Sequence, residues 1–201
     1  MTIIGFGVQL RRMNRSDIER IRTWRNAPEI QALMFEQAYI SADEQEKWFE
    51  TVNNALNYFF LIEVEHKPVG LIYAKNLDAV TLEGEGGIFM GESTYRSSDI
   101  PARASLLWLW VCFEYFGFDT SRIKVKSENA IALAYNAFLG YQLNREEGEM
   151  ISMELTKAHF MQSKGMRMLR TFQFDRDRVQ IVGEPSELNL PIINSFLRYQ
   201  R

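Results

Sequence analysis

The sequence predicts a mixed α/β fold in which one long buried helix stands between two groups of strands. Tyr58–His66 and Val69–Lys75 are rich in β-branched and aromatic residues, and the turn pair Lys67-Pro68 between them indicates a hairpin. Pro101–Phe116 is apolar on most sides, as a helix covered all round by other elements is. Arg122–Lys126 then alternates like a half-buried strand. Such an order favours layers of sheet and helix around one core.

The N-terminal region predicts a strand followed by a helix. Gly7–Met13 has strand character, and either Asn14 or Ser16 can accept hydrogen bonds from the first N–H groups of the next helix. This helix ends near Pro28, because the residue before a proline disfavours the helical conformation.

A third strand is expected over Leu82–Glu92, where three glycines interrupt the pattern at Gly84, Gly86 and Gly87. Glycine inside a strand marks a bulge or a place where another backbone or a ligand approaches closely.

A second helix is predicted after Asn129, which can serve as its N-cap, and Gly140 fits the left-handed position that ends it. Its expected buried stripe has helical spacing and comprises Ile131, Ala134, Tyr135, Phe138 and Leu139. Read from the residues alone, Asn129 is a cap and Tyr135 a core residue whose hydroxyl finds a nearby carbonyl.

The chain is expected to close with a hairpin of Tyr141–Asn144 and Met150–Leu155. Residues 158–201 lie beyond it and are expected to hold a strand over Arg176–Val182 and a helix over Glu187–Leu197. We interpret this C-terminal extension as a docked segment or a dimer contact. The alternative is a lid whose arginines meet an anionic substrate.

Composition narrows the class of protein. A net charge of −3 gives no basic character that would indicate nucleic acid as a partner. Cys112 is the only cysteine, which suits a reducing, cytoplasmic setting. The longest apolar run is too short and too interrupted for a membrane span, and we expect no metal.

Several of these residues also resemble a known family. Asn129, Ala132, Gly140 and Tyr141 resemble the N-x-x-A and G-[FY] elements of the GNAT N-acyltransferases. Tyr135 comes one residue early for one spacing of the family tyrosine and is similar to a second form of the motif. The resemblance covers roughly residues 7–157. It implies acetyl-CoA or another acyl-CoA as co-substrate, with Tyr135 protonating the leaving thiolate and Asn129 contacting the pantetheine arm.

The resemblance extends to the expected third strand and the junction after it. Gly87–Gly91 is similar to the strand that binds pantetheine in this family, with a backbone N–H near Phe89 stabilising the oxyanion. The pyrophosphate loop of the family, R-x-x-G-x-[GA], is replaced here by residues without glycine, and the cofactor contacts carried over are Phe89, Gly91, Arg96, Ser97, Ser98, Asp99 and Ile100. Because Pro101 offers no N–H, both a variant cradle and weak coenzyme A binding stay open.

The N-terminal motifs resemble one branch of the family, which acetylates ribosomal protein N-termini or nucleotide-linked aminosugars. These motifs are Trp24-Arg25-Asn26, Met34-Phe35, Ile40-Ser41-x-x-Glu44 and Trp48-Phe49, and Ser41 with Glu44 also forms a capping box. The aminosugar enzymes often have a histidine where this chain has Gln45. Arg25 is a candidate substrate residue because a guanidinium binds phosphate with two donors, although a surface ion pair is the commoner role.

The family mechanism is direct attack of a primary amine on the thioester, for which Glu85 is a candidate base and Glu83 a candidate substrate contact. We expect residues 1–157 to form the acyltransferase domain and a nucleotide-linked aminosugar to be the acceptor. A protein N-terminal acetyltransferase and a non-catalytic binding module are the alternatives, and a homodimer is an open alternative to a monomer.

Overall fold

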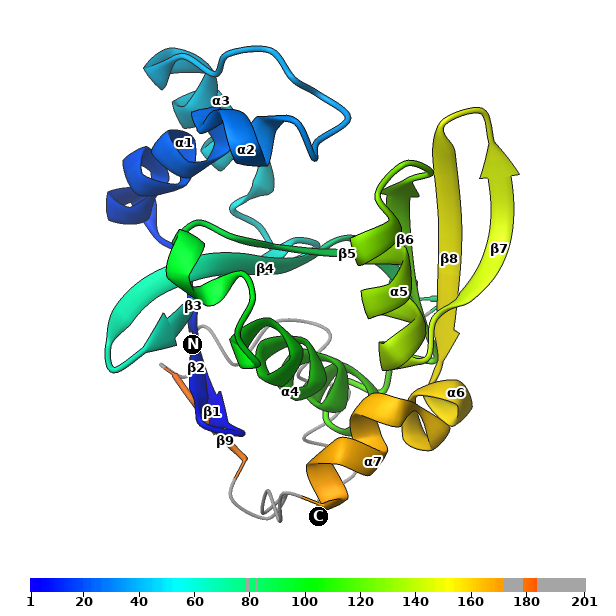
Figure 1. The fold of residues 1–201 in the computed structure, drawn as a ribbon. Helices are drawn as coiled ribbons and strands as arrows, with labels where there is room; N and C mark the ends of the chain where they lie inside the picture. The colour runs from blue at the N-terminus through cyan, green and yellow to red at the C-terminus, as the bar shows by residue number, and fades with distance from the viewer. Residues whose placement is uncertain (79, 82, 172–178, 184–201) are drawn as a thin grey trace.

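The computed structural model describes residues 1–78, 80–81, 83–171 and 179–183. Its nine strands form one sheet in the order β7-β8-β6-β5-β4-β3-β2-β1-β9 (Figure 1). Their bounds are β1 Thr2–Gly5, β2 Val8–Arg12, β3 Tyr58–Val64, β4 Lys67–Asp78, β5 Glu83–Met90, β6 Thr120–Lys126, β7 Gln142–Glu147, β8 Met150–Thr156 and β9 Gln180–Val182. In the described chain every strand pair is antiparallel except β5 with β6. The predicted mixed α/β fold is confirmed, and its sheet is mostly antiparallel and flanked by helices.

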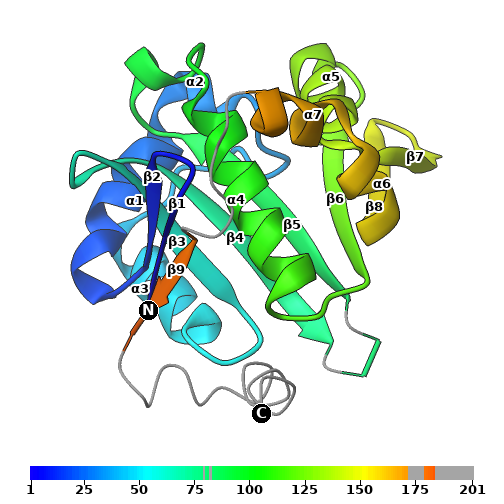
Figure 2. The same cartoon turned by 90° about the horizontal axis from the view of Figure 1, so that it is seen from below.

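Helices cover both faces of this sheet (Figure 2). The layer on one face holds α1 (Ile18–Asn26), α2 (Pro28–Gln31) and α3 (Ala42–Val52), and a 3₁₀ turn, η1 (Arg15–Asp17), leads into it. The other face carries α4 (Ile100–Glu114), α5 (Ala130–Leu139), α6 (Lys157–Gln162) and α7 (Lys164–Thr171), and η2 (Ser93–Tyr95) precedes α4. Each layer has its own apolar core, and α4 forms the centre of the larger one.

Short polar motifs set several helix ends as the sequence predicts. The Ser41 hydroxyl accepts from the Glu44 N–H at 3.3 Å, and the Glu44 carboxylate accepts from the Ser41 N–H at 2.8 Å, which completes the capping box of α3. Asn14 caps η1 in the same reciprocal way with Asp17. Gly140 ends α5 with a φ of 102°, a left-handed conformation that glycine adopts without a steric cost.

The hairpin of β3 and β4 differs from the prediction in its turn. Glu65 and His66 form the turn with φ values of 49° and 62°, and Lys67 and Pro68 already belong to β4. Two residues with positive φ match the twist of the flanking strands, which a Lys-Pro turn does not. Pro68 is tolerated because the register shifts at this point of the strand pair.

The buried face of α5 is also different from the predicted stripe. Ile131 is 85% exposed and Ala134 is exposed as well, whereas Ala132, Tyr135 and Leu139 pack against the larger core. The helix is therefore rotated relative to a stripe chosen on hydrophobicity alone, because its contacts are with α4 and α7.

Part of the C-terminal extension lies on this fold. Helices α6 and α7 pack on α5 and β8, and β9 pairs with β1 at the edge of the sheet. Of the strand expected over Arg176–Val182, Gln180–Val182 is observed; the rest of that strand and the helix expected over Glu187–Leu197 fall outside the described residues. In the described parts of the chain, no helix combines the length and the apolar character that crossing a membrane requires.

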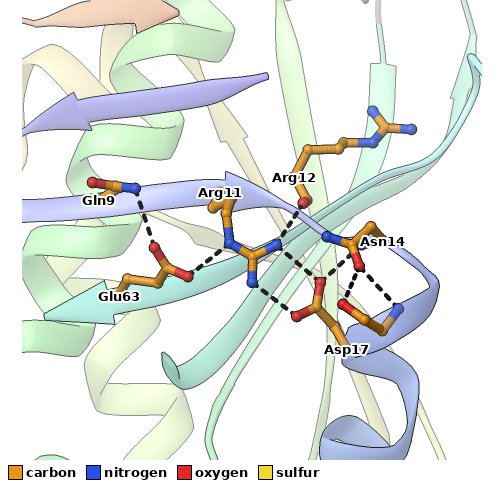
Figure 3. A network of polar contacts seen from close by, with 7 residues as sticks. Gln9, Arg11, Arg12, Asn14, Asp17 and Glu63 are labelled. Atoms are coloured by element: carbon orange, nitrogen blue, oxygen red, sulfur yellow. Dashed lines mark hydrogen bonds and ion pairs between the residues drawn. The ribbon is translucent and has the colours of Figure 1, made fainter. Parts of the chain in front are cut away.

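A buried ionic network joins the sheet to the start of α1 (Figure 3). Arg11 of β2 donates to both carboxylate oxygens of Asp17, at 2.8 and 3.0 Å, and to Glu63 of β3 at 2.7 Å. Gln9 completes the contacts of Glu63, and the Asn14 N–H completes those of Asp17. Both carboxylates are under 10% exposed, so the network fixes the position from which α1 begins.

Candidate active site

Strands β5 and β6 lie side by side over only three residue pairs, from Glu83 with Thr120 to Glu85 with Arg122. Beyond these pairs β5 continues to Met90, while β6 stays paired with β8 along its whole length and diverges from β5 (Figure 1). We term this divergence the strand split. Over residues 86–90 the edge of β5 at the split has no strand partner in the described chain. An open strand edge is a site at which an extended ligand binds through backbone hydrogen bonds.

Backbone geometry shows which groups of β5 face the split. The Met90 carbonyl accepts from Arg96 Nε at 3.3 Å, on the side away from β4. Residues two apart in an antiparallel strand point their N–H and C=O groups to the same side, so Gly86 and Ile88 also face the split. The backbone of Phe89 faces β4 instead, and its carbonyl lies close to Gly70. The N–H groups next to Phe89 that face away from β4 are therefore those of Ile88 and Met90.

Gly87 of β5 and Gly91, which follows β5, lie close to aromatic side chains of the protein. A Cβ on Gly87 would lie 2.3 Å from the Tyr73 ring, and a Cβ on Gly91 would lie 2.1 Å from the Trp24 ring. The bulge is on the neighbouring strand. Between the pairs Lys75–Glu85 and Asp78–Glu83, β4 advances by three residues while β5 advances by two.

The loop that resembles a pyrophosphate cradle turns its arginine inward. Arg96 donates to the Met90 and Gly91 carbonyls and pairs with Glu29 of α2 at 3.1 Å. The Ser98 hydroxyl also serves the loop itself, since it donates to the Tyr95 carbonyl and accepts from the Ile100 N–H. Arg96 thus holds the end of β5 in place and does not point its charge outward.

The start of α4 nevertheless keeps features that suit an anion. Asp99 makes no side-chain cap; its carboxylate pairs with Arg103 one turn later, which offsets its negative charge. The N–H groups of Ser97 and Asp99 have no hydrogen-bond partner among the described residues. Ile100 is 8% exposed and packs into the core, so it anchors this helix start. Unpaired N–H groups at a helix N-terminus favour phosphate.

Asn129 and Tyr135 of α5 both have structural contacts. The Asn129 side-chain oxygen accepts from the Ala132 N–H at 3.0 Å, so the predicted cap is present, and its amide nitrogen has no partner in the described part of the chain. The Tyr135 hydroxyl donates to the Pro101 carbonyl at 2.9 Å and lies 2.7 Å from Ser105 Oγ. Burial raises the pKa of Tyr135 well above its ordinary value. Tyr135 therefore joins α5 to the first turns of α4.

A pocket of about 350 Å³ lies on the opposite face of the sheet, under α1, α3 and the segment between α2 and α3. Its lining comprises Ile21, Arg25, Glu36, Ala38, Tyr39, Ile40, Glu44, Gln45, Trp48, Phe59, Leu71, Tyr73, Lys75 and Phe89. The side chain of Phe89 forms part of the pocket, whereas the backbone N–H and C=O of Ile88 face the split. Strand β5 therefore borders both the pocket and the split.

Arg25 and Gln45 supply buried donors to this pocket. Arg25 Nε and Gln45 Nε2 are buried and have no hydrogen-bond partner among the described residues. Burial lowers the pKa of Arg25, although a guanidinium keeps its proton at any physiological pH. The surface ion pair considered for Arg25 is not observed within the described chain.

Glu83 and Glu85 lie where β5 and β6 are still paired, and both are bound by cations. Glu83 is held by Arg122, with Nη2 at 2.8 Å, and Arg122 also pairs with Glu154. Glu85 is bound by Lys75 at 2.8 Å and Lys124 at 3.1 Å. Burial opposes ionisation of Glu85, but these two lysines outweigh it, so its pKa lies below the ordinary value. Lys75 lines the pocket, whereas neither Glu83 nor Glu85 does.

Sequence reasoning missed several pocket residues. Tyr73 and Lys75 lie on β4 two residues apart, so they share the face of the sheet that Leu71 also occupies. This alternation is the signal that could have found them. Trp48, named above only as part of a motif, packs edge-on against Phe59 at 5.1 Å and also lines the pocket.

The sequence comparison defines the class of protein. The family profile described as acetyltransferase (GNAT) domain matches residues 8–142, which is more than half of the chain. The chain belongs to this family, and its class is that of the N-acetyltransferases. A search of curated proteins finds no match to the sequence.

Similar solved structures share this fold at low sequence identity. A spermidine N-acetyltransferase from Vibrio cholerae in complex with CoA and spermine has 17% identity and a TM-score of 0.70, covering 77% of this chain and 98% of its own. FdhC, a nucleotide-linked sugar GNAT in its apo form, has 19% identity and a TM-score of 0.70, covering 84% and 97%. A domain from Methanocaldococcus jannaschii has 19% identity and a TM-score of 0.65, covering 78% and 99%.

Proposed function

We propose that the chain transfers an acetyl or short acyl group from an acyl-CoA to a primary amine, and that the amine belongs to a nucleotide-linked aminosugar. The observation that carries this proposal is the position of β5 between the strand split and the pocket. Its backbone edge offers a site for an extended donor, and its Phe89 side chain lines a site for an acceptor. Holding two reactants in line supplies a large part of the rate of a direct transfer.

The residues at the split fit an acyl-CoA, which when bound supplies the thioester. The backbone groups of Gly86 and Ile88 face the split, as shown above, and would hold the amides of the pantetheine arm. The Asn129 amide nitrogen, at the start of α5, has no other partner in the described chain and would add a donor. The N–H groups of Ser97 and Asp99 would bind the pyrophosphate, so the loop acts through its backbone although it lacks glycine.

Two observations support an aminosugar nucleotide as the acceptor. Arg25 places a cation in the pocket, and a guanidinium suits the diphosphate of such a molecule. One protein with the same fold is FdhC, a nucleotide-linked sugar GNAT. The pocket volume of about 350 Å³ suits a sugar ring, so the nucleotide would extend beyond the pocket.

The proton-transfer roles of Glu85 and Tyr135 stay predictions. A base must accept a proton from the ammonium group, and the two lysines on Glu85 weaken it as a base. An acid must reach the thiolate within hydrogen-bond distance, whereas the Tyr135 hydroxyl donates to Pro101. For Tyr135 the contacts favour a positioning role.

Calorimetric titration with acetyl-CoA, and then with a longer acyl-CoA, tests the donor site. We expect micromolar binding; no binding up to millimolar concentration in folded protein would support a non-catalytic module instead. Acceptor assays then compare a nucleotide-linked aminosugar, an N-terminal peptide of a ribosomal protein and spermidine. Acetylation of the peptide alone would overturn the choice of acceptor and leave the acetyltransferase reaction in place.

A further inference from the structure

The pocket contains two donors whose hydrogen-bonding capacity the protein leaves unused. Gln45 is only 4% exposed, and its Nε2 has no acceptor among the residues that the structure describes. Arg25 lines the same pocket, and its buried Nε is equally without an acceptor in the described chain. Buried polar groups are nearly always paired, so two unpaired donors in one pocket need an explanation.

The other charged groups of the pocket do not neutralise Arg25. Glu44 is engaged in the capping box with Ser41, and Lys75 pairs with Glu85. Glu36 also lines the pocket, but no ion pair joins it to Arg25 in the described chain. The Tyr73 hydroxyl is near enough to act on Arg25 electrostatically, but a phenol is uncharged at neutral pH. Arg25 is thus a partly buried cation with a buried Nε, and it has no counter-charge among the described residues.

We propose that the acceptor amine carries a compact anionic group, a phosphate or a carboxylate, and that Arg25 and Gln45 together bind it and select the acceptor. This inference rests on the proposed function: it keeps Arg25 as the residue that binds the anionic part of the acceptor and adds Gln45 as a second donor. A guanidinium and an amide N–H₂ group can donate to different oxygens of one anion. The same arrangement disfavours a polyamine, because a polycation would approach an uncompensated Arg25.

The position of α1 gives this site a rigid base. Arg25 lies on the same helix whose start is fixed by the Arg11–Asp17–Glu63 network (Figure 3). Gln45 lies on α3, which packs against α1. Donors on two packed helices hold their separation better than donors on loops do, so they discriminate anions by geometry as well as by charge.

Side-chain ¹⁵N–¹H NMR tests the binding directly, without an acyl-CoA. Inorganic phosphate, pyrophosphate and acetate are titrated separately, with chloride at matched ionic strength as the reference. We expect the Arg25 Nε–H and Gln45 amide signals to shift with saturation, and the preferred anion distinguishes phosphate from carboxylate. Arg25→Met should abolish the saturable shift of Gln45. Arg20→Met is the matched control, because Arg20 is an exposed arginine of α1 that does not line the pocket.

Kinetics with matched amines provide the second measurement. We expect glucosamine 6-phosphate to have a KM about tenfold to a hundredfold below that of glucosamine, the range given by charge-assisted hydrogen bonds. In Arg25→Met this ratio should fall toward one. Absence of any saturable anion shift up to about 100 mM, a range that covers weak single-ion sites, would overturn the inference, as would an equal effect of Arg20→Met. If acetyl-CoA still binds in either case, transfer from an acyl-CoA stands, and it is the anionic acceptor bound by Arg25 that fails.

Discussion

Replacing Gly87 by alanine tests whether the pocket and the strand split are separate binding sites on either side of β5, as the structure indicates. The new Cβ would lie 2.3 Å from Cζ and Oη of Tyr73, a separation at which the ring must move. Tyr73 is stacked on Phe59 at 5.0 Å and lines the pocket, so its displacement changes the space open to the acceptor.

The magnitude follows from two opposing effects. Overpacking of a well-packed site costs about 1–3 kcal/mol. Loss of glycine flexibility in the unfolded chain returns about 0.4–1 kcal/mol, since the φ of Gly87 is not in the left-handed region. We therefore expect Gly87→Ala to lower the free energy of unfolding by about 1–2 kcal/mol.

The assay combines urea unfolding with acceptor kinetics at saturating acetyl-CoA. The KM for the acceptor should rise, while the calorimetric Kd for acetyl-CoA should change little, because residue 87 faces the pocket and not the split. Gly86→Ala is the matched control for the loss of stability alone: its Cβ would meet Ser121 and Ile123 at 3.5 and 3.6 Å, which are ordinary contacts. The reasoning is refuted if Gly87→Ala is as stable as the wild type, or if acetyl-CoA affinity falls while the acceptor KM stays constant.

Three further predictions concern single side chains. Arg11→Met leaves two buried carboxylates unpaired and should destabilise the fold by about 3–5 kcal/mol, whereas Arg15→Met, which breaks exposed pairs only, should cost under about 1 kcal/mol by the same unfolding assay. Glu85 has a lowered pKa, so its ion pairs stabilise the fold above its ordinary pKa of 4.5 and are lost as pH falls below it; Glu85→Gln should flatten acid unfolding in that range, and an unchanged pH profile would contradict this. Tyr135→Phe should cost about 1–2 kcal/mol of stability with kcat near that of the wild type, whereas a 10²–10³-fold loss of kcat measured at unchanged acetyl-CoA affinity would establish the acid role instead.

The sequence predicted those parts of the fold that depend on neighbours along the chain. The capping box of Ser41 and Glu44, the cap of Asn129 and the left-handed Gly140 are local interactions, and each is present in the structure. The burial of α4 could also be predicted from local sequence, because a helix that is apolar on most sides is stable only when other elements cover it.

The site shows where sequence reasoning stops. Arg25 was a candidate from its motif, but its lack of a counter-charge depends on which carboxylates reach it. Glu44 is engaged with Ser41, and no ion pair joins Glu36 to Arg25 in the described chain. Arg96 was expected to meet a diphosphate, yet its guanidinium lies on the carbonyls at the end of β5. A side chain's chemical type is fixed by sequence, whereas its partner is fixed by packing.

What the sequence by itself determined is the order and type of most elements, the family to which the chain belongs and the residue types available for chemistry. Only the tertiary structure decided that β5 separates from β6 after Glu85, that its Gly86 and Ile88 groups face the split, and that Arg25 and Gln45 meet in one pocket. The physical reason is that hydrophobic period and capping act over a few residues. Strand register, the bulge on β4 and the pairing of buried charges arise between segments far apart in the chain, where packing and hydrogen bonding outweigh local preference.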